Sequence, residues 1–156
     1  MISLREFVML RRFLTIALLS LAVSASALAA DTKPHRIAIQ VDQNDPQVMN
    51  MVLNNATHVI EYFRDKNEDV DVEIVAYGPG LHMLRSDSSP VQDRIKRLKD
   101  MVFPGKIQFS ACNNTKQGME KAEGHAIPIV PEATVVPSGV VRLMELQEAG
   151  WSYVRP

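Results

Sequence analysis

Cys112, the only cysteine of the 156-residue chain, is the residue best suited to covalent chemistry. It follows the apolar segment 107–111 and precedes Asn113-Asn114-Thr115, so the sequence predicts that a strand ends and a short helix begins there. The free N–H groups and partial positive charge of a helix N-terminus stabilise a thiolate and lower its pKa from about 8.5. A thiolate attacks sulfur electrophiles, so a persulfide on Cys112 is chemically reasonable.

A packing role is the alternative interpretation of Cys112. Cysteine is among the most buried residue types, and a cysteine at a strand end often only fills the core. Position alone leaves both interpretations open, because reactivity depends on exposure and on the pKa of the thiol. A single cysteine excludes an internal disulfide and a Cys-x-x-Cys dithiol.

The remaining motifs favour no other chemistry. The four histidines are scattered without metal-ligand spacing, so we expect no metal and no other cofactor. His82, close to Gly78-Pro79-Gly80, is a minor candidate for a proton partner of Cys112. That glycine loop lacks the third glycine of a dinucleotide fingerprint and is better explained as a tight turn. The absence of a Gly-x-Ser-x-Gly sequence argues against a serine hydrolase.

The elements that must position Cys112 alternate between strands and helices. Apolar and β-branched segments predict strands at 36–41, 70–76, 107–111, 133–136 and 151–154. Helical periodicity and capping residues predict helices at 46–63, 91–102 and 114–123, and a last one between Ser138 and Gly150. This order predicts the α/β class: a three-layer α/β/α sandwich with a five-stranded, mainly parallel sheet.

The carboxyl ends of the strands are the expected binding edge of such a sheet. Four segments follow strands there, namely 42–45, 77–81, 112–115 and 137–139. We expect Asn113 and Asn114 to cap the helix beside the thiol. The candidate site comprises Cys112 as the reactive residue, with Tyr77, Gly78, Asn113, Asn114, Thr115, Ser138 and Gly139 as binding residues.

The first 29 residues have the pattern of a secretory signal peptide. Basic residues precede the apolar run 13–23, and Ala27-Leu28-Ala29 satisfies the small-x-small rule for signal peptidase. We therefore expect export, to the periplasm if the source is a Gram-negative bacterium, with no membrane anchor after cleavage. Residues 30–156 would form a single domain. The formal net charge of −1 offers no electrostatic footprint for nucleic acid.

Taken together, four segments of the chain resemble the DsrE-like family (DsrE/DsrF type) of small sulfur-relay proteins. They are Val75-Ala76-Tyr77-Gly78-Pro79-Gly80-Leu81, Phe109-Ser110-Ala111-Cys112-Asn113-Asn114-Thr115, Val136-Pro137-Ser138-Gly139-Val140-Val141 and Gly150-Trp151-Ser152-Tyr153-Val154-Arg155-Pro156. The resemblance implies a five-stranded three-layer domain that assembles into trimers or hexamers. It also implies that Cys112 carries a persulfide, received from a sulfur donor protein and passed to an acceptor protein.

Two functions follow as hypotheses. The first is a sulfur carrier that uses Cys112, which leaves open whether the protein is an enzyme. The second is a non-enzymatic, oligomeric protein of the same fold that binds a small ligand in the crevice or serves as a scaffold.

Overall fold

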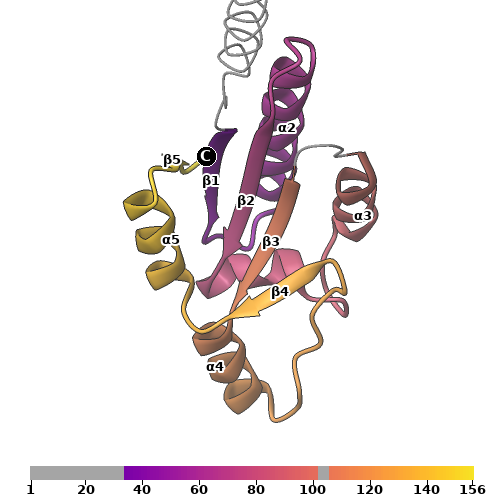
Figure 1. Cartoon of the computed structure of the whole chain (residues 1–156). Helices are drawn as coiled ribbons and strands as arrows, with labels where there is room; N and C mark the ends of the chain where they lie inside the picture. Colours follow the sequence, from indigo (N-terminus) through magenta and orange to yellow (C-terminus); the bar gives the residue numbers. More distant parts are fainter. Residues whose placement is uncertain (1–33, 102–105) are drawn as a thin grey trace, which may run out of the picture. The chain divides into compact units, whose positions relative to one another are not determined.

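A single five-stranded sheet organises the part of the chain that the computed structural model describes, residues 34–101 and 106–156 (Figure 1). The strands are β1 (His35–Val41), β2 (Val70–Ala76), β3 (Lys106–Cys112), β4 (Ala133–Val136) and β5 (Ser152–Val154). Their order is β4-β3-β2-β1-β5, and every neighbouring pair is parallel. The expected signal peptide lies outside the described residues.

The connections between strands are helical, as parallel pairing requires. They are α2 (Pro46–Arg64), the 3₁₀ helix η2 (Gly78–Leu84), α3 (Gln92–Met101), α4 (Asn113–Glu123) and α5 (Gly139–Glu148). The sequence places the start of α2 correctly, because Asp45 accepts a hydrogen bond from the Gln47 N–H and Pro46 is the first helical residue. Among the described residues, no helix combines the length and apolar character needed to cross a membrane.

Each face of the sheet has its own helical cover, because side chains along a strand alternate between the two faces. Ile39, Ile74 and Phe109 belong to the larger apolar core, which also includes residues of α2 and α3. Ala38 and Val75 belong to the smaller cluster on the other face, with Leu143 and Leu146 of α5. The predicted α/β class and five-stranded parallel sheet are therefore confirmed, in an arrangement consistent with the three-layer sandwich.

The junction between β3 and α4 differs from the prediction in one respect. The strand runs to Cys112 and the helix begins at Asn113, so no loop separates them. Cys112 itself, with extended backbone angles, is the N-cap residue. Asn113 and Asn114 therefore lie inside the first turn and do not cap it. The consequence is that the thiol stands directly at the helix N-terminus.

Candidate functional site

The candidate site lies where β2, β3 and β4 end side by side. In the register of the sheet, Ala76 pairs with Ala111 and Cys112 pairs with Val136. The segments that begin at Tyr77, Asn113 and Pro137 therefore leave the sheet at the same edge. This is the edge at which ligands bind in open α/β sheets.

Direct contacts join these three segments. The Gly78 N–H donates a hydrogen bond to Thr115 Oγ1 at 2.9 Å, and the Asn114 N–H donates to the Pro137 carbonyl oxygen at 3.3 Å. Gly78 has a φ of +51°, a conformation that favours glycine. The structure thus brings together the segments that the sequence singled out separately.

Gly139 makes the closest approach to the thiol-bearing residue. A Cβ atom added at Gly139 would lie 2.9 Å from Tyr77 Cβ and 3.3 Å from Cys112 Cβ. Only glycine fits at this distance without displacing a neighbour. Gly139 is also the first residue of α5, whose N-cap Ser138 accepts a hydrogen bond from the Val141 N–H. Two helix N-termini, those of α4 and α5, therefore meet at Cys112.

This arrangement lowers the pKa of the Cys112 thiol. Burial acts to raise the pKa, since only 4% of the residue is exposed. Hydrogen bonds from the Thr115 side chain and from the backbone of Gly139, Thr115 and Asn114 act in the opposite direction and outweigh burial. A cysteine that merely packs in an apolar core has a raised pKa instead. The environment of Cys112 is therefore one that stabilises a thiolate.

Tyr77 forms the wall of the site toward β1. Its Cβ end contacts Gly139, and its hydroxyl end lies among polar groups that include Gln40 and Asp42. Burial, followed by the negative charge of Asp42, raises the pKa of the Tyr77 phenol. The Asp42 carboxylate accepts a hydrogen bond from Arg155 at 2.9 Å, which ties the C-terminal segment to the same edge. This polar cluster beside Tyr77 was not recognised in the sequence.

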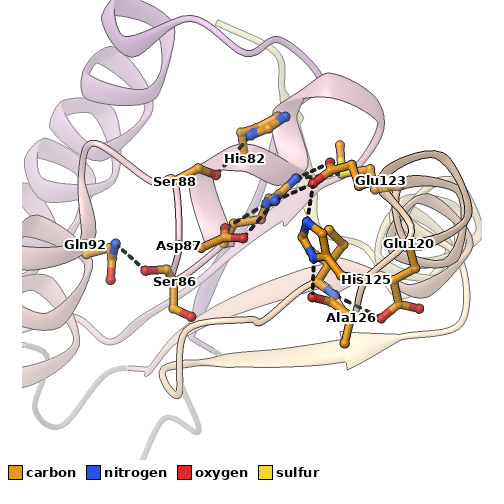
Figure 2. A network of polar contacts seen from close by, with 12 residues as sticks. His82, Ser86, Asp87, Ser88, Gln92, Glu120, Glu123, His125 and Ala126 are labelled. Carbon is orange, nitrogen blue, oxygen red and sulfur yellow. Dashed lines mark hydrogen bonds and ion pairs between the residues drawn. The ribbon is translucent and has the colours of Figure 1, made fainter.

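None of the residues of helix α4 is buried, although Met119 packs against the larger core, and polar contacts also hold the helix. Arg85, which is 4% exposed, donates paired hydrogen bonds to Asp87 and to Glu123 near the end of α4. Figure 2 shows this network, in which His125 lies 3.4 Å from Glu123. The hydrogen bonds from Arg85 lower the pKa of Asp87 to about 2. The far end of α4 is thereby fastened to the segment after η2.

The structure changes the interpretation of Asn113, Asn114 and His82. Asn114 is exposed and Asn113 half-buried, and of this pair the Asn114 backbone is the group that acts on the thiol. His82 has its ring nitrogen 3.1 Å from Ser88 Oγ, which gives it a partner other than Cys112. Within residues 34–101 and 106–156, no group of three or more His, Cys, Asp or Glu side chains could hold a metal ion.

Comparison with known proteins identifies the family. The model of the DsrE/DsrF-like family matches residues 35–156. The solved structure of MTH1491, a protein of unknown function from Methanobacterium thermoautotrophicum, is similar with a TM-score of 0.65 and 28% sequence identity. The match covers 78% of this chain and 99% of that chain. None of the curated proteins matches the sequence. Because the family model covers most of the chain, this protein belongs to the DsrE/DsrF-like family.

Proposed function

We propose that this protein is a sulfur carrier that holds a sulfane sulfur atom as a persulfide on Cys112. The observation that carries the proposal is the convergence of donors on one thiol. The Thr115 side chain and the backbone of Asn114, Thr115 and Gly139 together lower the pKa of Cys112 in spite of its burial. Membership of the DsrE/DsrF-like family agrees with a role in sulfur relay.

The transfer step conserves atoms and electrons. The Cys112 thiolate attacks the outer sulfur of a donor persulfide, R–S–SH. A new S–S bond forms at Cys112, the S–S bond of the donor breaks, and the donor leaves as the thiolate RS⁻. A thiolate of the acceptor then attacks the outer sulfur and releases Cys112 as a thiolate. No external oxidant is needed, because the sulfane sulfur only changes its partner.

The residues around Cys112 have separate roles in this scheme. The N–H groups at the start of α4 and α5 stabilise negative charge on the sulfur both before and after loading. Tyr77 and Gly78, which follow β2 in the chain, line the site, with Tyr77 on the side toward β1, and Ser138 fixes the start of α5 by capping it. Asn114 contributes through its backbone N–H, because both asparagines lie inside the first turn of α4 and Cys112 holds the N-cap position.

The test is intact-mass analysis of the protein after exposure to a small persulfide donor. The wild type should gain sulfur atoms that a reductant removes, and Cys112→Ser should gain none. Met119→Leu, a change elsewhere on α4, serves as a control and should load like the wild type. Loading of Cys112→Ser, or an unreacted thiol in the wild type under the same conditions, would contradict the proposal.

A non-enzymatic ligand-binding or scaffold protein is the second candidate. The observation that favours it is the 4% exposure of Cys112, which is typical of a packing residue. This alternative predicts that the native thiol reacts with a small alkylating reagent only at the rate of unfolding. Rapid labelling of the folded protein would count against it.

We also propose that the protein forms a homo-oligomer, a trimer or a hexamer. Three apolar residues of α5, Val140, Val141 and Met144, are about half exposed (50–54%) and lie within five residues of Gly139. Apolar side chains gathered in this way are suited to a subunit contact. Light scattering on the purified protein measures the assembly, and a monomer at all concentrations would refute it.

Export is a further proposal, with residues 1–29 acting as a cleaved signal peptide and residues 30–156 as the mature single domain. The support is the basic start, the apolar run and the Ala27-Leu28-Ala29 sequence. N-terminal sequencing of protein from a Gram-negative periplasm should begin at Ala30. An intact N-terminus on protein that remains inside the cell would contradict the proposal.

A further inference from the structure

Glu73 is a carboxylate in the middle of the sheet. It lies on β2, the central strand, and is 1% exposed. A buried carboxylate is strongly disfavoured unless charged and polar groups surround it. Glu73 lies on the face covered by α5, and the other buried residues of its strand are apolar. The burial of this one carboxylate therefore requires an explanation.

Two partners from distant parts of the chain satisfy Glu73. Arg142 of α5 donates from Nε to Oε1 at 2.7 Å and from Nη2 to Oε2 at 2.8 Å. Ser110 of β3 donates its hydroxyl to Oε1 at 2.6 Å. Within the described residues, no buried side-chain nitrogen or oxygen lacks a hydrogen-bond partner. Glu73 therefore connects α5 with β3 through three hydrogen bonds.

Both partners lie next to the candidate site. Ser110 is two residues before Cys112 on β3, so the two side chains are on the same face of the strand. Arg142 follows Gly139 by three residues, so it stands one turn further along α5. The backbone N–H of Arg142 also donates a hydrogen bond to the Ser138 carbonyl oxygen at 2.9 Å, within the first turn of the helix. Together with the hydrogen bond from Ser110, the ion pair thus links the strand that carries the thiol to the helical turn that faces it.

The form of the contact indicates positioning in addition to charge neutralisation. A guanidinium that binds both oxygens of a carboxylate fixes distance and orientation together, whereas a lysine ammonium acts as a point charge. The close packing of Gly139 against Tyr77 and Cys112 leaves little freedom for the start of α5. Because Arg142 is bonded to Ser138 within the same helical turn, a displacement of Arg142 would change the distance between the Gly139 N–H and the sulfur.

We infer that the Glu73–Arg142 ion pair is a positioning device that holds the first turn of α5, and with it the Gly139 N–H, against the Cys112 sulfur. Arg142 is a positioning residue, because it acts through Gly139 and does not touch the reacting sulfur. The inference rests on the proposed function, in which Cys112 works as a thiolate.

The test measures the pKa of the Cys112 thiol from the ultraviolet absorbance of the thiolate, with Cys112→Ser as the blank. Arg142→Met keeps the apolar stem and removes the guanidinium, and Arg142→Lys keeps the charge without the paired geometry. Glu145→Gln is the matched control, because Glu145 is the exposed second partner of Arg142 at 3.5 Å. The double variant Glu73→Gln/Arg142→Met removes both charges and leaves no buried unpaired charge.

We expect Arg142→Met and the double variant to raise the thiol pKa by about one unit, which is about a tenfold smaller thiolate fraction below that pKa. Arg142→Lys should lie between them and the wild type, and Glu145→Gln should match the wild type. An unchanged thiol pKa in the folded double variant would overturn the inference. If the wild type fails to load sulfur while the pKa shift appears, the sulfur-carrier function fails and the positioning role remains.

Discussion

Gly139→Ala is the most direct test of the close approach between α5 and the thiol. The added methyl group would lie 2.9 Å from Tyr77 Cβ and 3.2 Å from Tyr77 Cδ1. Because Tyr77 Cβ is anchored to the backbone, the start of α5 must move outward. The same movement lengthens the hydrogen bond from the Gly139 N–H to the sulfur.

Two opposing effects set the size of the stability change. Overpacking costs about 1–3 kcal/mol. Alanine in place of glycine favours the helix by at most about 1 kcal/mol, and by less in the first turn. We therefore expect a net loss of about 1–2 kcal/mol in the free energy of unfolding. A hydrogen bond to a charged group contributes about 1.5–3 kcal/mol. Its partial loss should raise the thiol pKa by about one unit.

Gly118→Ala provides a matched control on the neighbouring helix. Gly118 lies in α4, and an added Cβ there would meet nothing within 4 Å. The control should gain about 0.5–1 kcal/mol of stability and leave the thiol pKa unchanged. Urea denaturation and ultraviolet titration of the thiolate measure both quantities. If Gly139→Ala behaves like Gly118→Ala in both assays, the reasoning about the site is wrong.

Three further predictions concern the groups around the thiol. Thr115→Val removes the hydroxyl, which lowers the pKa of Cys112 more than any other group does, so the thiol pKa should rise. Thr115→Ser keeps a hydroxyl and should stay close to the wild type in the same titration. Asp87→Asn should lower the free energy of unfolding by roughly 1–2 kcal/mol at neutral pH, after allowance for solvent screening. Because the pKa of Asp87 is depressed in the folded state, this difference should shrink as the pH falls from about 4 through about 2, which acid denaturation of both proteins measures. The wild type should gain stability relative to Cys112→Ser as the pH rises from the folded thiol pKa toward the unfolded value of about 8.5. In that range only the unfolded state binds the proton, and thermal melts across it show whether the stability difference rises with pH.

The fold was predictable because its signals are local. Each strand is a short apolar segment, and each helix start has its own marker, such as Asp45-Pro46 or Ser138. The order of elements then implies a parallel sheet and a common carboxyl edge. The sequence alone therefore places Tyr77, Cys112 and Gly139 at one edge of the sheet.

The part of the site that the sequence did not predict depends on contacts between residues that are far apart in the sequence. Arg142 and Glu73 are 69 positions apart, and no local sequence pattern around either residue predicts their contact. The only local signal was an acidic residue inside an otherwise apolar strand, the segment Val70–Ala76. The start of α4 was misplaced for a related reason. Asparagine is a good capping residue in general, but the strand continues to Cys112 because Cys112 pairs with Val136 of β4.

Burial of Cys112 affects both the pKa of the thiol and the access of reagents to it, whereas the hydrogen-bond donors affect only the pKa. Burial alone would raise the thiol pKa and exclude bulky reagents. The donors from Thr115 and from the two helix N-termini reverse the change in pKa, but they leave the steric exclusion in place. Steric exclusion of this kind predicts that small sulfur donors react with Cys112 faster than bulky thiol reagents do. The exposed residues Val140, Val141 and Met144 lie within five residues of Gly139 on α5, so a second subunit bound there would further restrict access to the thiol.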